Sequence, residues 1–390
     1  MKYNLIATST FGIEAVVAQE LKKLGYENLK IENGRVEFQG TEEDIVKCNL
    51  WLRCADRVLI KINEFKAESF EELFQGAKAY KWADLIPIRG KMHVNGKSIK
   101  SMLHSVPDCQ AIVKKAIVES MKKTYKTDWF EENGPVFKIE VGILKDIVTL
   151  TVDTSGPGLH KRGYREMAGE APLKETLAAA MVLLSKWEPH RVFADPLCGS
   201  GTIAIEAALI GKNMAPGLGR SFAAEEWSNI PSKLWEEGRA AARAAINDLE
   251  FRILASDINS RILVTARENA IKAGVENYIA FQKLDVLEFS SKKKYGCIIS
   301  NPPYGERIGE LKEVEKLYKN MGKVFSELDS WSFFVITSHL DFQRVIGKRA
   351  TKNRKLYNGR IQCYFYEFFG PLPKRRDMKE EDTSKVTETE

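Results

Sequence analysis

The stretch IISNPPYGER, residues 298–307, places a side-chain amide, two prolines and an aromatic ring directly after an apolar run. Consecutive prolines can neither continue a helix nor donate to a sheet, so a strand ends here in a rigid loop. The Asn301 side-chain carbonyl and the Pro302 backbone carbonyl could accept both protons of an exocyclic amine, while Tyr304 stacks on its base. Positioning and electrostatics, rather than a strong base, would then promote attack of that planar amine on a methyl donor. The alternative for this loop alone is a tight turn with a surface tyrosine.

A second strand end carries Asp195, followed by Gly199, Gly201 and a helix. Glycines let a backbone approach a ligand closely, and a helix amino terminus adds positive potential. The segment GSGTIA also fits the dinucleotide pattern G-x-G-x-x-A. The Asp195 carboxylate favours a different ligand, because it would repel a pyrophosphate but suits the ammonium or sulfonium of S-adenosylmethionine. An ordinary glycine turn with a capping aspartate is the alternative.

Two further acids follow apolar runs. Asp257 could accept both hydroxyls of a ribose, a role common to NAD and S-adenosylmethionine sites, or it could cap a helix. Asp285 could accept from an adenine amino group, or it could be an exposed loop acid. Ligands of open α/β sheets bind at the carboxyl ends of the strands. Polar residues suited to a ligand at four strand ends of one chain argue against coincidence.

The elements that must position these residues alternate strand and helix from about residue 156 onward. This alternation predicts a doubly wound, mainly parallel α/β sheet, closed by an antiparallel edge hairpin on Asn358-Gly359. Residues 2–60 predict a small α+β unit with a hairpin on Asn33-Gly34 and a helix capped by Thr41. Residues 61–155 predict a second α+β unit, with a helix from about Asp108 to Lys126 and a hairpin across Lys145-Asp146.

Composition narrows the class of protein. At 390 residues two or three domains are expected, and the 44% hydrophobic and 29% charged fractions are typical of a soluble protein. The sequence shows neither a signal-peptide pattern nor an apolar run of the roughly 18 residues that a membrane helix needs. Its six cysteines are scattered. We therefore expect no membrane anchor, no disulfide framework, no metal site and a cytoplasmic location.

The net charge of +6 is compatible with a nucleic-acid partner. Residues 343–360 hold seven basic side chains and no acidic one, which a solvated surface would also explain. The predicted long helix adds an exposed lysine face that favours contact with RNA or DNA. That face includes Lys114, Lys115 and Lys122.

The motifs DPLCGSGT, SDIN, LDVLEF and NPPYGER, in this order, resemble those of class I S-adenosylmethionine-dependent N-methyltransferases. The segments LHKRGYRE, APLKETLAAAM and GLGRSFAAEEW narrow the resemblance to the RlmL/YpsC-like group of THUMP-domain RNA guanine-N2 methyltransferases. The resemblance implies a ferredoxin-like unit at 1–60, an RNA-binding THUMP domain at 61–155 and a Rossmann-like methyltransferase domain at 156–373. Residues 374–390 are expected to form a disordered tail.

The resemblance also implies roles for individual residues. The catalytic loop would be Asn301, Pro302, Pro303 and Tyr304. The residues implied to bind S-adenosylmethionine are Pro172, Leu173, Asp195, Cys198, Gly199, Gly201, Thr202, Asp257, Ile258, Asp285 and Val286. RNA phosphates near the active site would meet Lys161, Arg162 and Arg165. Lys114, Lys115 and Lys122 are expected to contact RNA because of the lysine face of the long helix, independently of the resemblance.

The expected activity is therefore methyl transfer to guanine N2 in structured RNA, with 23S rRNA as the leading substrate and tRNA as the alternative. A guanine inside a helix would have to be flipped out first. DNA adenine-N6 methylation, a non-catalytic RNA-binding assembly factor and an NAD-dependent oxidoreductase are less favoured. The choice of guanine over adenine rests on the family likeness, since the motif is common to both.

Overall fold

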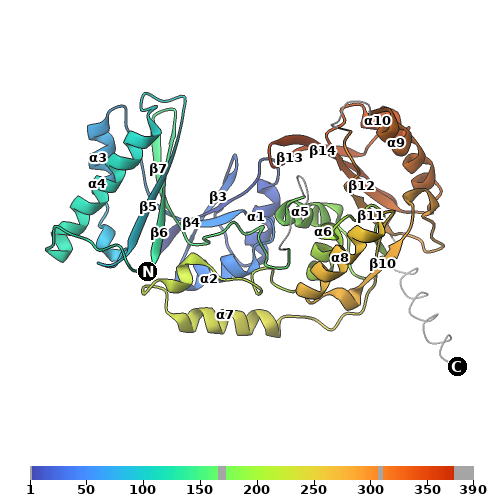
Figure 1. The fold of residues 1–390 in the computed structure, drawn as a ribbon, viewed down its shortest axis with the longest axis horizontal. Helices are drawn as coiled ribbons and strands as arrows, with labels where there is room; N and C mark the ends of the chain where they lie inside the picture. The colour runs from blue at the N-terminus through green and yellow to red at the C-terminus, as the bar shows by residue number, and fades with distance from the viewer. Residues whose placement is uncertain (1, 166–172, 306–310, 373–390) are drawn as a thin grey trace. The chain divides into compact units, whose positions relative to one another are not determined.

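The computed structural model describes residues 2–165, 173–305 and 311–372 (Figure 1). The chain forms two compact units. Unit 1 contains Met1–Arg162 and Ala215–Ala245, and unit 2 contains Gly163–Met214 and Ile246–Glu390. The predicted tail, 374–390, lies outside the described residues. Within the described ranges, no helix is long and apolar enough to cross a membrane.

Unit 1 is built on one seven-stranded sheet with the order β2-β3-β1-β4-β7-β6-β5. Asn33-Gly34 joins β2 to β3 and Lys145-Asp146 joins β6 to β7, which confirms both predicted hairpins. The Asp44 carboxylate accepts from the Thr41 N–H (2.7 Å) at the start of α2. The strands are β1 (Tyr3–Thr8), β2 (Lys30–Glu32), β3 (Arg35–Gly40), β4 (Arg57–Lys66), β5 (Lys91–Ile99), β6 (Val136–Leu144) and β7 (Ile147–Asp153), and the helices are α1 (Glu14–Lys23), α2 (Glu42–Trp51), α3 (Phe70–Lys78) and α4 (Val106–Tyr125).

Strand β4 connects the two predicted N-terminal units. It pairs with β1 along one edge and with β7 along the other, so the sheet continues through the predicted boundary at residues 60 and 61. A register shift between Lys61 and Asn63 interrupts the β4–β7 ladder. The backbone groups of β4 therefore pair with β1 of the predicted first unit along one edge and with β7 of the predicted second unit along the other. The two predicted units thus have β4 in common, at the position where the sequence suggested a boundary between them.

Unit 2 contains a second seven-stranded sheet, in the order β10-β9-β8-β11-β12-β14-β13. The first five strands are parallel and the last two add an antiparallel hairpin, which confirms the predicted fold class. Its strands are β8 (Phe193–Asp195), β9 (Ile253–Asp257), β10 (Ile279–Lys283), β11 (Cys297–Ser300), β12 (Ser332–Thr337), β13 (Lys352–Asn358) and β14 (Ile361–Phe368). Asn358 still pairs with Ile361, so the hairpin turns on Gly359-Arg360, one residue later than predicted.

Helices follow several of the parallel strands: α6 follows β8, α8 follows β9 and α9 follows β11 (Figure 1). The core beneath α9 combines Tyr318, Met321 and Phe325 with Ile298 and Phe333 of the sheet. All five side chains are buried, and this packing holds α9 against β11 and β12. The helices of unit 2 are α5 (Glu175–Ser185), α6 (Thr202–Gly211), α8 (Ser260–Lys272), α9 (Leu311–Ser326) and α10 (Phe342–Ile346).

Residues 215–245 leave unit 2 between α6 and β9 and belong to unit 1. Their helix α7 (Ser232–Ala244) packs on α2, and Trp227 stacks on Phe137 of β6 with a ring distance of 4.5 Å. The Arg220 guanidinium donates to backbone carbonyls of a single segment. These are the carbonyls of Ser155 (3.3 Å), Pro157 (2.6 Å), Gly158 (2.6 Å) and Lys161 (3.0 Å). The insertion is therefore a structural part of unit 1.

Replacing Arg220 with alanine is expected to lower the free energy of unfolding by about 2 kcal/mol, because the freed carbonyls lose a charged donor. Amide hydrogen exchange should rise at residues 155–161. The matched control is Arg243→Ala, which removes an exposed guanidinium from the last turn of α7. Urea unfolding and exchange on the full chain test this expectation. Equal effects of the two substitutions would contradict it.

Candidate active site

The predicted chemistry lies along one edge of the unit 2 sheet. Strands β10, β9, β8 and β11 are neighbours and parallel, so their carboxyl ends share an edge. Asp195 and Asp257 are the last residues of β8 and β9, Asp285 follows β10, and Asn301 follows β11. The chain moves outward from β8 to β10 and then returns to β11 on the other side of β8. This reversal is the place where open α/β sheets bind ligands.

The loop after β8 is shaped by its glycines. Gly199 and Gly201 have φ angles of +51° and +85°, which favour glycine. Nothing lies within 4 Å of the position that a Gly199 side chain would take, so this backbone is open to a ligand. The Cys198 N–H donates to the Ser256 carbonyl (2.9 Å), which ties the loop to β9. Cys198 is buried, and burial raises the pKa of its thiol.

The Asp257 carboxylate links two of the loops. Its Oδ2 accepts from the Gly199 N–H (3.0 Å) and its Oδ1 from the Asn259 N–H (2.9 Å). Each oxygen keeps a lone pair for a further donor, such as a ribose hydroxyl. The cap of α8 is Asn259, whose side chain accepts from the Arg261 N–H, so Asp257 is not occupied as a helix cap. Ile258, beside it, is 60% exposed and offers an apolar surface to a base.

Asp285 and Val286 are held differently. The Asp285 side chain accepts from the Leu287 N–H (2.9 Å) and caps a short helical turn, Val286–Glu288. Val286 is buried in the core beneath α9. Asp285 therefore has the local capping role as well as a position on the site edge, whereas the Val286 side chain belongs to the core.

Asp195 carries a buried acceptor without a partner. The residue is 1% exposed, and its Oδ1 accepts from the Leu197 N–H at 3.4 Å. No described residue donates to its Oδ2. Burial, and after it the nearby charge of Asp257, raise the pKa of Asp195 well above its usual range, although the Leu197 N–H and the nearby buried hydroxyl of Ser300 act in the opposite direction. A buried carboxylate with so few donors is compatible with a cationic ligand, and the contact of Asp195 with such a ligand stays a prediction.

Arg165 brings two predicted cofactor residues together. Its Nη1 donates to the Leu173 carbonyl (3.2 Å) and to Thr202 Oγ1 (3.1 Å), and its Nη2 pairs with Glu175 (2.8 Å). The Arg165 side chain is only 9% exposed, which is typical of a structural role rather than of a phosphate contact. Pro172 lies outside the described residues.

The other basic candidates differ in exposure. Arg162 is buried and donates to the Leu159 and Arg53 carbonyls, so its guanidinium is also structural. Lys161 and Lys115 are exposed. Two of the helix lysines are paired with acids, Lys114 with Glu132 (2.7 Å) and Lys122 with Glu119 (3.1 Å).

The Asn-Pro-Pro-Tyr loop is internally bonded. The Tyr304 hydroxyl donates to Asn301 Oδ1 (2.7 Å), and the buried Tyr318 hydroxyl donates to the Pro303 carbonyl (2.6 Å). No residue in the described ranges donates to the Pro302 carbonyl. Sequence reasoning missed Tyr318, and the available signal was only a polar tip among the apolar positions of an amphipathic helix.

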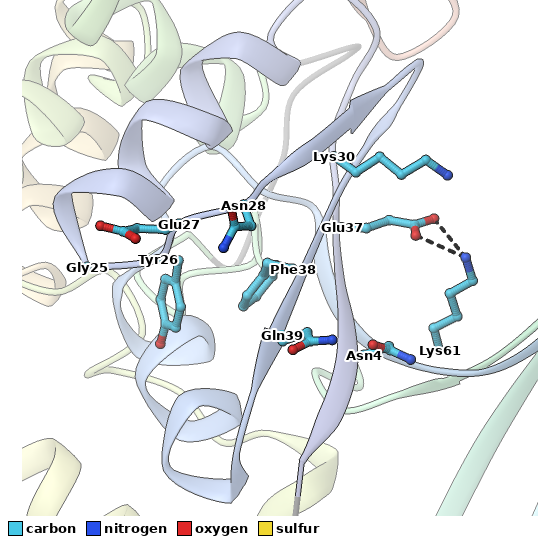
Figure 2. Close-up of a pocket in the computed structure, with 10 residues that line it drawn as sticks. All are labelled: Asn4, Gly25, Tyr26, Glu27, Asn28, Lys30, Glu37, Phe38, Gln39 and Lys61. Atoms are coloured by element: carbon cyan, nitrogen blue, oxygen red, sulfur yellow. Dashed lines mark hydrogen bonds and ion pairs between the residues drawn. The ribbon is translucent and has the colours of Figure 1, made fainter.

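A hollow of about 660 Å³ lies in unit 1, and none of the predicted site residues lines it (Figure 2). Lys61 reaches across it to Glu37 (2.9 Å), and Lys30 pairs with Glu32 (2.6 Å). Its charges therefore neutralise one another, and it contains none of the motifs that predict chemistry. The described ranges also contain no cluster of three His, Cys, Asp or Glu side chains that could hold a metal ion.

Three family models match the chain. They are the RlmL ferredoxin-like domain at residues 4–59, the THUMP domain at 67–153 and the RMKL-like methyltransferase domain at 162–367. A curated relative, the putative RNA methyltransferase YpsC of Bacillus subtilis (strain 168), is 50% identical over 382 residues. The match covers 97% of this chain and 99% of that relative.

Solved structures resemble the chain over nearly its full length. One, a predicted N6-adenine-specific DNA methylase from Listeria monocytogenes, is 49% identical with a TM-score of 0.91, covering 95% of this chain and 97% of that one. Another is SMU.472, a putative methyltransferase complexed with SAH. It is 46% identical with a TM-score of 0.91, covering 96% of this chain and 99% of that one.

The orphaned Asp195 carboxylate predicts a pH-dependent gain in stability on Asp195→Asn. A raised pKa in the folded state contributes stability below the unfolded-state pKa, and this contribution is lost as pH rises through the folded-state pKa. The neutral amide does not carry this loss. The variant should therefore gain stability over wild type as pH rises from about 5 to about 8, as measured by urea unfolding. If the stability advantage of Asp195→Asn over wild type instead grows as pH falls, the pKa of Asp195 is not raised in the folded state.

Proposed function

Because the chain belongs to the family of RMKL-like methyltransferases, we propose that it methylates the exocyclic N2 amine of a guanine in RNA, with S-adenosylmethionine as donor. The proposed substrate is 23S rRNA. The observation that carries the proposal is the shared edge of β9, β8 and β11, which brings an orphaned carboxylate, a two-acceptor carboxylate and the Asn-Pro-Pro-Tyr loop together.

The residues of this edge fit S-adenosylmethionine, which supplies an electrophilic methyl group when bound. Asp195 would face the cationic part of the cofactor, and its buried Oδ2 would gain a partner there. Asp257 would hold the ribose with its remaining lone pairs, and Ile258 would cover the adenine. Asp285 would lie at the far side of the adenine pocket. The relative SMU.472, whose structure contains SAH, supports this choice of cofactor.

The Asn-Pro-Pro-Tyr loop would hold the acceptor amine. Asn301 Oδ1 already accepts from the Tyr304 hydroxyl, but a carbonyl oxygen has two lone pairs and can accept a second proton. The Pro302 carbonyl would take the other amine proton. Holding both protons orients the nitrogen lone pair, and Tyr304 would stack on the ring. The main contribution of these residues is therefore position.

RNA is the proposed polymer on three grounds. The relative YpsC is described as a putative RNA methyltransferase, a THUMP domain matches unit 1, and Lys115 and Lys161 expose cationic side chains. The Listeria neighbour, described as a DNA methylase, keeps duplex DNA as the competing substrate. Transfer RNA is the second RNA candidate. We also propose a cytoplasmic location, which the free state of all six cysteines supports.

A modification map decides between these substrates. In a strain that lacks the gene, mass-spectrometric mapping should show the loss of one N2-methylguanine from 23S rRNA, and adding back the gene should restore it. Transfer RNA from the same strain is the internal control. If the lost mark lies in tRNA, the rRNA substrate is wrong. An unchanged RNA map with a lost methyladenine in DNA would overturn the whole substrate class.

Asn301→Ala is expected to lower kcat for RNA methylation by about 100- to 1,000-fold, because one of the two proposed carbonyl acceptors is lost. Affinity for RNA should change little, since most of it comes from basic side chains. The matched control is Asn277→Ala, which removes an exposed amide from the turn before β10, at the other end of the parallel strands from the loop. Methyl-group incorporation and filter binding measure the two quantities. Wild-type turnover in Asn301→Ala would exclude the proposed role.

A further inference from the structure

A buried tyrosine hydroxyl, that of Tyr318, contacts the Asn-Pro-Pro-Tyr loop. Tyr318 of α9 is fully buried, and its hydroxyl donates to the Pro303 carbonyl at 2.6 Å. The same oxygen lies 2.9 Å from Oγ1 of Thr337, the last residue of β12. One side chain therefore ties together the loop, a helix and the end of a neighbouring strand.

The direction of these hydrogen bonds follows from counting protons. A phenol has one proton, and the Pro303 carbonyl can only accept, so Tyr318 donates there. Thr337 must then donate to the Tyr318 oxygen. The Thr337 oxygen in turn accepts from the His339 N–H at 3.1 Å. The result is a directed chain from the His339 amide to Pro303, in which each bond strengthens the next.

The surroundings keep Tyr318 in this donor role. Its ring packs edge-on against His339 (5.7 Å between ring centroids) and Phe342 (5.0 Å). The His339 Nε2 lies 3.3 Å from Glu315 Oε1, which connects the chain back to α9. Burial raises the pKa of Tyr318 to about 12, so the phenol keeps its proton at physiological pH.

The loop has few other ways to be fixed. Neither Pro302 nor Pro303 has an N–H, so backbone donors cannot anchor this part of the loop. A carbonyl is the remaining backbone group, and the Pro303 carbonyl is the one that is held. The Pro303 carbonyl lies in the peptide plane between Pro303 and Tyr304, and the proline ring fixes φ of Pro303. Only ψ of Pro303 then separates this plane from the one that contains the Pro302 carbonyl, so holding the Pro303 carbonyl restrains the direction of the Pro302 carbonyl. The Pro302 carbonyl is the acceptor proposed for the substrate amine.

We propose that Tyr318 is a positioning residue for methyl transfer, acting through the Pro303 carbonyl, with Thr337 directing its hydroxyl. The inference rests on the proposed function of the loop. A tyrosine that only satisfied its own hydroxyl in the core would contribute to stability and not to turnover. The two roles are separable, because misplacing a reacting group lowers kcat without weakening the binding of either substrate.

Tyr318→Phe removes only the hydroxyl. It should lower kcat for RNA methylation by about 10- to 100-fold and leave KM for RNA and the Kd for S-adenosylhomocysteine within about twofold. Thr337→Val, which removes the hydroxyl that donates to Tyr318, should also lower kcat. Thr337→Ser, which keeps the hydroxyl, should stay near wild type. The matched control is Tyr26→Phe, which breaks a similar bond to Asp44 (2.7 Å) in unit 1 and should leave kcat unchanged.

Two results would overturn the proposal. One is wild-type kcat in Tyr318→Phe, and the other is a loss of turnover matched by equal losses in S-adenosylhomocysteine binding and in the urea midpoint. Amide exchange at Tyr304 and Gly305 gives a readout that needs no substrate, and it should rise in Tyr318→Phe but not in Tyr26→Phe. If wild type methylates no RNA, the proposed function fails, while unchanged exchange at these amides rejects the role of Tyr318 separately.

Discussion

Parallel pairing of β8 with β9 on one side and β11 on the other is the constraint on which the candidate site depends. It places Asp195, Asp257 and Asn301 at one edge of a sheet, although more than 100 positions separate the first from the last. An antiparallel β11 would carry Asn301 to the opposite edge. The connecting helices make this pairing possible, because a parallel crossover needs a long covering segment.

The same constraint creates a tension between stability and activity. Parallel strands are buried on both faces, so a carboxylate at a central strand end is desolvated unless something pairs with it. Asp257 resolves this by accepting from two backbone N–H groups. Asp195 does not, and its Oδ2 stays without a donor among the described residues. An acceptor left unsatisfied in the free protein is typical of a site that is completed by its ligand.

Local signals explain what the sequence could predict. The hairpin residues, the Thr41 cap and the strand-end motifs are each determined by a few neighbouring residues, and the structure has them where the sequence placed them, with a one-residue shift at Gly359. The alternation of strands and helices in the sequence was sufficient to predict the mainly parallel sheet of unit 2. The order β10-β9-β8-β11 is known only from the structure, because the usual handedness of crossovers determines the face that each connection covers and not which strands are neighbours.

Long-range contacts explain what the sequence could not predict. Nothing local in β4 shows that its two edges pair with different halves of unit 1. The GLGRSFAAEEW segment served only to narrow the family resemblance, and only the fold shows Arg220 bonded to the 155–161 backbone. Arg162 and Arg165 read as phosphate ligands until their partners, carbonyls and Glu175, are known. Basic side chains in a loop cannot be sorted into structural and functional ones without tertiary contacts.

The Asn-Pro-Pro-Tyr loop shows how such contacts sharpen a motif. The sequence identified two carbonyl acceptors and a stacking ring, but it did not show how a loop with two prolines keeps them in place. In the structure the Tyr304 hydroxyl occupies one lone pair of Asn301, and Tyr318 holds Pro303 from behind. If the proposed function is right, the two acceptors are oriented before any substrate arrives, and the cost of ordering them is met during folding. Preorganisation of this kind explains how a loop without a base could promote transfer to a weak nucleophile.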